Sequence, residues 1–304
     1  MGKILVSGLI NIETTVRVDG FPVQYTPVRY PFFGVNSTVS GVGYNVARAL
    51  VTLGAPVSFV SMIGRDLEAG NVYEQLRRDG IPHAFVIEEL EQTARSVILY
   101  DSSGRRMINV DLKDLQERTY PEVLFEQAAH AASLAVLCNI NFSRPFLSTM
   151  QRRGVPIATD VHAITRLDDV YNRDFMAAAH ILFMSDELLP CTPEEWVKGL
   201  WNRFGTAIAV VGLGAQGALL GVLRDETLAR FPAVHTRPVV NTIGAGDALF
   251  ACFVYVYHQT GDPYLAMNKA IVFASYKIGA SGAADGFLNA SGLDRLYDEI
   301  LRAG

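Results

Sequence analysis

The chain has few cysteines and no arrangement of them that would stabilise a small secreted fold. Three cysteines occur among 304 residues, namely Cys138, Cys191 and Cys252, and their spacing shows no pairs. Disulfide frameworks and zinc sites both depend on paired cysteines at characteristic spacing. We therefore expect free thiols and a cytoplasmic protein, because the cytoplasm keeps thiols reduced.

Long basic runs and long apolar runs are also lacking. The formal net charge is −5 and no Lys/Arg run is present, which argues against nucleic acid as a partner. The apolar stretch 248–257 is too short to span a bilayer. The first residues show neither the apolar stretch nor the small-residue cleavage site of a signal peptide. We therefore expect no nucleic-acid partner and no membrane partner.

Apolar residues make up 50% of the chain, enough for a buried core. The length permits one large domain or two modest ones. From about residue 123, helical segments alternate with short apolar runs at 134–139, 156–160, 180–184 and 207–211. This alternation predicts an α/β fold with a mostly parallel sheet and helices on both faces.

Two extended stretches interrupt this pattern. Polar and apolar residues alternate over 11–19, with Asn11 and Glu13 on the same face, and a second extended run covers 35–40. Runs 96–100 and 105–110 flank a turn sequence and predict a hairpin. We expect these stretches to form a small accessory sheet. The predicted division is a body of 1–10, 41–92 and 113–304 and an accessory sheet of 11–40 and 93–112.

A glycine-rich segment, Asn241-Thr-Ile-Gly-Ala-Gly-Asp247, precedes an almost wholly apolar run that predicts a buried helix. A Gly-x-Gly turn entering a helix exposes several backbone N–H groups, and the helix adds about half a positive charge. Together they suit a phosphate group. Asp247 in the first helical turn either complements the helix dipole or acts as a general base.

Two other glycine-rich segments have a structural and a functional interpretation each. Ser40–Asn45 is either a tight turn into a helix or a place where the backbone approaches a polyhydroxy ligand, with Asn45 reaching a hydroxyl. A dinucleotide fold fits less well, because a third glycine is missing and no acidic residue closes a second strand. Val211–Gly217 forms either turn residues or the rim of a nucleotide pocket.

These segments, in this order, resemble the signatures of the ribokinase (PfkB-type) carbohydrate and nucleoside kinases over nearly the whole chain. The resemblance rests on Asn241–Asp247 followed by Ala-Leu-Phe-Ala-Cys-Phe, on Ser40–Asn45 followed by Val-Ala-Arg-Ala-Leu, and on Val60–Asp66 after Leu53-Gly-Ala-Pro-Val. It implies a three-layer α/β/α body with a small β-sheet lid that closes over the substrate.

The resemblance also implies an activity, namely ATP-dependent transfer of the γ-phosphoryl group to a primary hydroxyl, with Mg²⁺. Asp247 would be the base, and the N–H groups of Gly244, Ala245 and Gly246 would form an anion hole. The residues implied in sugar binding are Asn11, Glu13, Gly41, Val42, Asn45 and Asp247. Those implied in ATP binding are Gly212, Gly214, Gly217, Thr242, Gly244, Gly246 and, near the adenine, Ser275.

The metal and cation sites are less clearly marked. Asp160 follows a strand, where side chains point into the ligand crevice, so it either organises Mg²⁺ through water or is a loop or cap residue. Asn241 replaces the Asp more usual in the family, which weakens the case for potassium activation. Glu13 also replaces a common Asp, Leu188 departs from an Asn-x-x-Glu motif, and Gly212 stands where Thr is frequent.

The acceptor stays open between a small sugar and a nucleoside such as pseudouridine, adenosine or cytidine. Aromatic residues in the predicted lid loop could stack on a base or seal a homodimer through the lid; they are Tyr25, Tyr30, Phe32 and Phe33. A non-catalytic sugar-binding protein and a dehydrogenase are the other classes. Retention of Asp247 argues against the first, and the second requires NAD(H) binding, which we do not expect.

Overall fold

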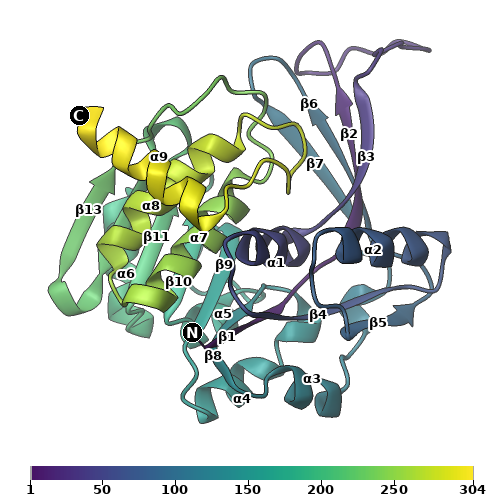
Figure 1. Ribbon diagram of the computed structural model, residues 1–304. Coiled ribbons are helices and arrows are strands. Elements are labelled where there is room, and N and C mark those ends of the chain that lie inside the picture. The colour runs from purple at the N-terminus through teal and green to yellow at the C-terminus, as the bar shows by residue number, and fades with distance from the viewer. Residues whose placement is uncertain (1, 304) are drawn as a thin grey trace.

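The computed structural model describes residues 2–303, and its strands form two sheets (Figure 1). The large sheet has the order β13-β12-β11-β10-β9-β8-β1-β4-β5 and is parallel except for β12 and β13. Its strands are β1 Lys3–Ser7, β4 Val57–Gly64, β5 Phe85–Leu90, β8 Ala132–Leu137, β9 Ile157–Ala163, β10 Ile181–Ser185, β11 Ile208–Gly212, β12 Ala218–Val222 and β13 Thr227–Phe231. The predicted mostly parallel sheet is confirmed.

Helices cover both faces of this sheet, because neighbouring strand residues alternate between two separate cores. Val6 and Val136 point into one core and Leu5 and Ala135 into the other. The first core is covered by α1 Val42–Thr52, α2 Leu67–Arg78, α7 Ala245–Thr260, α8 Pro263–Lys277 and α9 Ala290–Ala303; the second is covered by α3 Glu122–Ala128, α4 Phe146–Arg152, α5 Arg173–Ala178 and α6 Pro193–Phe204. The three-layer α/β/α architecture is therefore as predicted.

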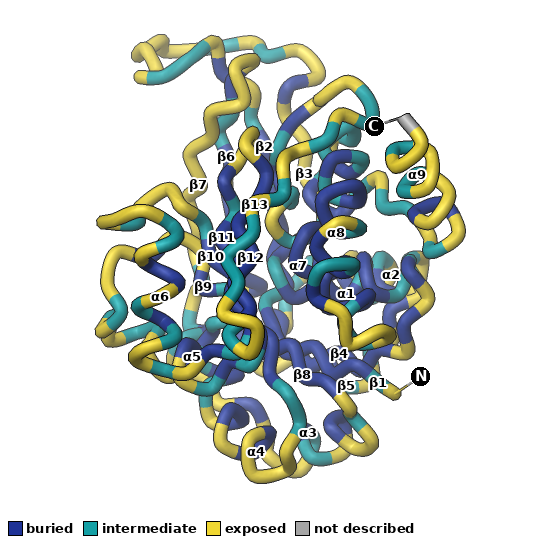
Figure 2. Tube along the Cα trace, turned by 90° about the vertical axis from the view of Figure 1, so that its left-hand side faces the viewer, coloured by how far each residue is buried: buried dark blue, intermediate teal, exposed yellow. Residues whose placement is uncertain are grey.

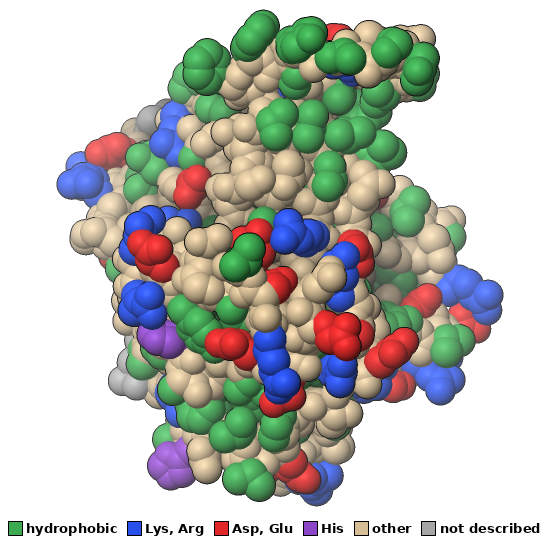
Figure 3. All heavy atoms as spheres, turned by 90° about the vertical axis from the view of Figure 1, so that its right-hand side faces the viewer, with side chains coloured by type: hydrophobic (Ala, Val, Ile, Leu, Met, Phe, Trp, Pro, Cys, Tyr) green, Lys and Arg blue, Asp and Glu red, His purple; other side chains and the backbone are tan. Residues whose placement is uncertain are grey.

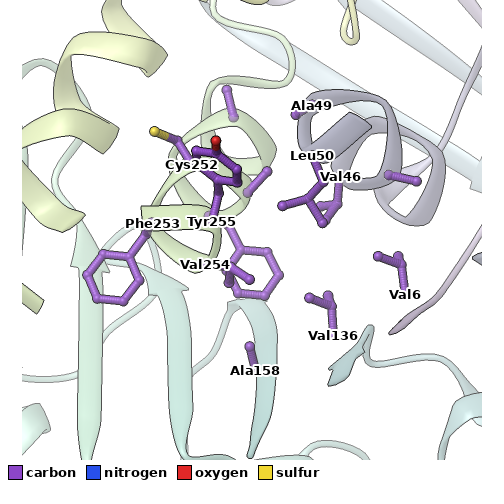
Figure 4. Close-up of a cluster of buried hydrophobic side chains, with 14 of the residues drawn as sticks. Val6, Val46, Ala49, Leu50, Val136, Ala158, Cys252, Phe253, Val254 and Tyr255 are labelled. Carbon is purple, nitrogen blue, oxygen red and sulfur yellow. The ribbon is translucent and has the colours of Figure 1, made fainter. Parts of the chain in front are cut away.

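Helix α7 runs through the middle of the first core, which explains its almost wholly apolar sequence. Its residues Ala248 to Val256 are all buried. Figure 4 shows side chains of α7 meeting Val46 and Leu50 of α1 on one side and Val136 and Ala158 of the sheet on another. A helix that is apolar all round is one that is enclosed all round. The beginning of α7 is therefore fixed by packing along its length.

The small sheet has the order β3-β2-β6-β7, with β2 Asn11–Arg17, β3 Val35–Ser40, β6 Arg95–Tyr100 and β7 Arg106–Asp111. Strand β2 pairs antiparallel with β3 and parallel with β6, and β6 and β7 form the predicted hairpin. Only residues 8–10 separate β1 from β2, so the chain passes directly from the large sheet into the small one. Figure 2 shows the outer loop of this sheet largely exposed.

Specific side chains and backbone conformations fix the ends of individual helices. Asp66 caps α2 by accepting a hydrogen bond from Glu68 N at 3.2 Å, and Gly54 ends α1 in the left-handed region with φ of 88°. Strands β5, β12 and β13 were not predicted. Among residues 2–303, no helix combines the length and the hydrophobicity needed to cross a membrane.

Candidate active site

The N-terminal turns of α1 and α7 bring Asn45 and Asp247 together although they are 202 positions apart. Asn45 Nδ2 donates a hydrogen bond to Asp247 Oδ2 at 2.7 Å. Both helices start at the same edge of the large sheet, which is where parallel α/β sheets bind their ligands. This bond uses Oδ2, and the other carboxylate oxygen, Oδ1, makes no side-chain hydrogen bond with the residues that the structure describes, so it can receive a proton.

Glycines allow α1 to approach this edge. A Cβ on Gly43 would lie 2.4 Å from the carbonyl carbon of Gly8, so α1 packs directly on the backbone that follows β1. Gly41, the N-cap of α1, has φ of 106°, a backbone conformation that residues with a side chain rarely adopt. Val42 is the first helical residue. The glycines of the segment 40–45 thus place Asn45, and the turn interpretation accounts for their identity.

The turn before α7 is shaped by Gly244 at its N-cap. Gly244 has φ of 74°, and a Cβ there would lie 2.2 Å from Ala283 O. At Gly246, by contrast, no described heavy atom lies within 4 Å of an added Cβ, so this side of the turn is open. Ala245 N donates to Thr242 O at 3.2 Å, which engages one of the three N–H groups predicted for the anion hole within the loop itself.

The predicted acceptor-binding residues of β2 form a polar wall beside Asp247. Ser40 Oγ donates to Glu13 Oε2 at 3.1 Å, and Asn11 Nδ2 donates to Ser96 Oγ at 3.1 Å. Among residues 2–303, Asn11 Oδ1 and Glu13 Oε1 are buried without a hydrogen-bond partner. Buried polar atoms are nearly always paired, so two orphaned acceptors on one wall indicate a ligand that supplies donors.

The polar face of β2 is the inward one, which the alternating pattern alone did not decide. Asn11, Glu13 and Thr15 are only 4%, 7% and 9% exposed. Burial raises the pKa of Glu13 above its usual value, and the nearby charge of Asp247 adds to the rise, whereas the Ser40 hydrogen bond and Lys277 oppose it. A buried carboxylate kept for stability alone would be costly, which supports a binding role.

Asp247 itself sits in surroundings that favour proton uptake. Removal of water from its carboxylate raises its pKa, and the nearby Asp160 adds to this. The hydrogen bond from Asn45 and the charges of His162 and Lys277 lower the pKa and partly offset the rise. A base works best when its pKa approaches the working pH, so the raised pKa suits proton abstraction from a hydroxyl.

Lys277, the last residue of α8, is a site residue that the sequence did not reveal. Its side chain is fully buried and Nζ donates a hydrogen bond to Ile243 O. Burial lowers its pKa to about 8, although Asp247, Asp285 and Glu13 act in the opposite direction. A lysine in the last turn of a helix ordinarily complements the helix dipole from solvent, so no sequence signal separates this one from that common case.

Arg106 of β7 is a second residue that the sequence did not identify. Its Nη1 donates a hydrogen bond to Thr242 Oγ1 at 2.9 Å. Thr242, which was predicted to face ATP, therefore contacts the small sheet. Ile98 of β6 packs with Ile243 and Ala283 in a separate apolar cluster. The small sheet therefore contacts the 241–247 turn at two points.

The residues predicted for ATP binding lie in two places. Gly212 ends β11, and Gly214 and Gly217 have φ of 57° and 96° in the turn that leads into antiparallel β12. Turn geometry alone explains the last two glycines. Ser275 Oγ donates to Val234 O at 2.7 Å and accepts from Thr236 N at 3.2 Å, so its hydroxyl fixes the chain before the 241–247 turn.

Asn241 also holds this turn in place. Its Nδ2 donates to Ser281 O at 2.7 Å and its Oδ1 accepts from Ile243 N at 3.0 Å. An aspartate could not donate to Ser281 O. The amide at this position therefore makes a bond that the more usual carboxylate would lack.

Asp160 lies near the end of β9, and its Oδ1 accepts a hydrogen bond from His162 N at 2.8 Å. Within the part of the chain that the structure describes, no group of three or more His, Cys, Asp or Glu residues could hold a metal ion. Magnesium usually keeps several waters and binds one or two carboxylates together with phosphates. A single carboxylate such as Asp160 fits that mode of binding.

The three-layer α/β/α body, in which a carboxylate lies beside a glycine turn at the start of a helix, resembles the structures of a known family. Residues 1–290 match the model of the family described as pfkB family carbohydrate kinase. The chain belongs to this family, and it is a phosphotransferase with an alcohol group as acceptor.

Comparison with individual proteins agrees with this assignment. The chain is 28% identical over 265 residues to an acarbose 7(IV)-phosphotransferase from Actinoplanes sp., covering 86% of each chain. A solved structure of a microbiome-derived acarbose kinase is 25% identical, with a TM-score of 0.86 over 98% of this chain and 99% of that one. Ribokinase from Arabidopsis thaliana, solved with ribose and ATP, has a TM-score of 0.80 at 19% identity and covers 97% of this chain and 98% of its own.

Proposed function

We propose that the protein is an ATP-dependent kinase that transfers the γ-phosphoryl group to a primary hydroxyl of a small sugar. The observation that carries this proposal is the pair of orphaned acceptors, Asn11 Oδ1 and Glu13 Oε1, on the wall beside Asp247. Hydroxyl groups donate hydrogen bonds and would satisfy both. A sugar offers several hydroxyls at once, so two can bind the wall while a third meets the base.

Asp247 is the general base of this reaction. Because Asn45 holds Oδ2, the acceptor hydroxyl gives its proton to Oδ1. The hydroxyl oxygen forms a bond to the γ-phosphorus as the bond from that phosphorus to the bridging oxygen of ATP breaks, and ADP leaves with the electron pair. Phosphoryl transfer depends mainly on positioning and charge stabilisation, so a well-oriented carboxylate suffices.

The N–H groups of the turn 244–246 stabilise the charge on the transferring phosphoryl oxygens. Gly246 leaves room for a phosphate to approach, Gly244 gives the turn its left-handed conformation, and the N-terminal end of α7 adds positive potential. The Ala245 N–H joins this anion hole when a phosphate replaces Thr242 O as its partner. Such donors are worth more in a site that excludes water than they are in bulk solvent.

ATP binds across the turn after β11 and the turn before α7, with Gly212, Gly214, Gly217 and Thr242 along its length. Ser275 acts on this side indirectly, because its hydroxyl is engaged with Val234 and Thr236. Mg²⁺ supplies neutralisation of phosphate charge when it is bound with ATP. Asp160 would hold it through a water molecule.

The small sheet acts as a lid over the acceptor, with 11–40 and 93–112 as its segments and 1–10, 41–92 and 113–304 as the body. Asn11 and Glu13 of β2 and Arg106 of β7 all belong to this sheet. Closure would bring these residues onto the bound substrate and exclude the water that would otherwise hydrolyse ATP.

We extend the proposal to a homodimer through the lid and to a cytoplasmic location. Figure 3 shows hydrophobic side chains gathered over the small sheet and its loop. The loop between β2 and β3 contains Tyr25, Tyr30, Phe32 and Phe33, which are 91%, 75%, 76% and 102% exposed. Exposed aromatic clusters of this kind favour an interface.

The proposal is tested by measuring ADP release with ATP over a panel of acceptors. The panel contains ribose, deoxyribose, ribose 1-phosphate, fructose and acarbose as sugars and inosine, adenosine, cytidine and pseudouridine as nucleosides. Turnover on at least one sugar supports the proposal, provided that Asp247→Asn abolishes it. Turnover on nucleosides but on no sugar would transfer the assignment to a nucleoside kinase.

The nucleoside alternative has one observation in its favour. The rings of Tyr30 and Phe32 stack at 6.3 Å with an interplanar angle of 18°, and both are exposed in the lid loop. Such a pair offers a flat surface to a base. Substituting Tyr30→Ala should then raise the KM of a nucleoside selectively and leave the KM of a sugar unchanged.

A further inference from the structure

Lys277 carries a positive charge into the interior at the point where the acceptor wall, the base and the glycine turn meet. Its side chain is fully buried, and its ammonium group donates to Ile243 O, directly before Gly244. A buried ammonium is costly unless neighbouring charges compensate it. Because burying this ammonium group costs free energy, its position beside the base and the glycine turn indicates a role in the site.

The charges that act on the ammonium group belong to several different elements of the fold. Asp247 of α7, Asp285 of the segment after α8, and Glu13 of β2 are negative, and Arg106 of β7 is positive. Lys277 therefore interacts at once with the base and with the acceptor-binding carboxylate. Glu13 and Asp247 are close enough for the charge of Asp247 to raise the pKa of Glu13, and Lys277 opposes that rise, so removing its charge would leave this repulsion uncompensated.

Two carbonyl groups near the glycine turn accept hydrogen bonds from side-chain donors of the protein. Lys277 Nζ binds Ile243 O, and Asn241 Nδ2 binds Ser281 O at 2.7 Å. Carbonyl oxygens are the ligands by which proteins bind potassium. In this chain an ammonium group and an amide group already bind two of them, so an external cation has no free carbonyl at these positions.

We propose that the Lys277 ammonium is a built-in monovalent cation that fixes the Ile243 carbonyl, aims the N–H groups of Gly244 and Gly246, and makes turnover independent of potassium. Lys277 is a positioning residue, because it acts through the turn and through Asp247. The inference rests on the proposed function, since it assigns a role in the same phosphoryl transfer.

The test compares Lys277→Met, Lys277→Arg and Lys277→Ala with Lys269→Met, a matched control on the same helix α8 whose lysine pairs with Asp294 at 2.6 Å. Turnover is measured with ATP and the best acceptor of the panel, in potassium chloride, ammonium chloride or choline chloride. Wild-type kcat should change less than about twofold between these salts, whereas Lys277→Met should lose about 100-fold in kcat, the effect expected when a site loses its geometry.

Recovery of Lys277→Ala turnover by an added cation distinguishes the proposed role from a purely structural one, because a cation would not repair a general loss of folding. Lys277→Ala opens space beside Ile243 O, so ammonium or potassium should raise its kcat at least about tenfold over choline, and Lys277→Arg should retain more activity than Lys277→Met. Lys269→Met should behave as wild type in every salt. A potassium-dependent wild type, or wild-type turnover by Lys277→Met, would overturn the inference.

Asp247→Asn separates this inference from the proposed function. If Asp247→Asn is inactive and Lys277→Met is fully active, only the role of Lys277 fails. If both variants keep full turnover, the assigned site fails as well.

The pH dependence of the unfolding free energy tests the inference independently of turnover, in case a variant is inactive for another reason. The pKa of Lys277 is lowered to about 8 in the folded chain and is 10.5 as a free side chain. Between these values the unfolded chain binds more protons, so the unfolding free energy of the wild type should rise with pH relative to Lys277→Met. An unchanged difference over this window would show that folding does not shift the pKa of Lys277, so that its side chain would lie in solvent and not beside Ile243 O, and the inference would fall.

Discussion

Arg106 Nη1 donates a hydrogen bond to Thr242 Oγ1 at 2.9 Å, and this bond joins the small sheet to the turn before α7. The preceding residue, Arg105, points elsewhere and pairs with Asp101 of its own hairpin at 3.1 Å. Two adjacent arginines thus have different partners. Only Arg106 lies where a phosphate on the turn 244–246 would meet a positive charge from the lid.

We predict that Arg106→Gln lowers kcat by about 10- to 100-fold, because it removes a charged donor from the developing phosphoryl charge. Arg105→Gln, the control, should change kcat less than about twofold, since the exposed Arg105 pairs with Asp101 of its own hairpin and lies outside the site. Steady-state kinetics at saturating ATP and acceptor provide the measurement. Equal losses in both variants would indicate that the hairpin acts only through its fold.

Asp247→Asn should remove the base and keep the shape of the site. We expect kcat to fall by about 10² to 10⁴, the usual contribution of general-base catalysis, and acceptor affinity to change little. Isothermal titration with the acceptor checks binding, and thermal unfolding checks that the variant folds. Turnover at the wild-type rate would show that another group takes the proton.

The pH profile should have two limbs with different origins. The acid limb reports Asp247, whose pKa is raised by burial, so kcat/KM should rise with pH at values above the ordinary carboxylate range. The alkaline limb reports Lys277, whose pKa is about 8, so kcat/KM should fall as its ammonium loses a proton. In Lys277→Arg the alkaline limb should move upward, because guanidinium stays charged. An unmoved limb would assign it to another group.

Gly244 and Gly246 form a matched pair for stability. An added Cβ at Gly244 would meet Ala283 O at 2.2 Å in a left-handed conformation, whereas Gly246 has open space around it. We expect Gly244→Ala to lower the free energy of unfolding by roughly 1–3 kcal/mol or more. Gly246→Ala should cost nothing or stabilise by about 0.5–1 kcal/mol, as alanine favours a helix. Denaturant unfolding measures both.

Much of the fold could be predicted because the strands of the large sheet are buried on both faces. The run Ile208–Val211, for example, is wholly apolar and buried, and it ends at Gly212. Strand β13 was missed because each of its residues is at least partly exposed, which leaves a weak apolar signal. Strand β12 is buried throughout, but it directly follows the glycine-rich segment 211–217, and that segment gives no sign that a strand begins after it.

The site was predicted less completely, for a physical reason. Asp247 and Asn45 lie in glycine-rich turns that have their own local signature. Lys277 and Arg106 lie in a regular helix and a regular strand, and their partners, Ile243 and Thr242, are distant in sequence. Only the folded chain shows that these charges face the turn. Ser275 shows the converse, because its hydroxyl is engaged by neighbours that the sequence could not assign.

The direct passage of β1 into β2 has a consequence for how such an enzyme changes its preference. Asn11 and Glu13 stand on the short strand that leaves the large sheet, while Asp247 stands on a helix held by the main core. Under the proposed function, substitutions confined to β2 would therefore change the acceptor preference, in evolution or by design, and would leave α7 and Asp247 unaltered.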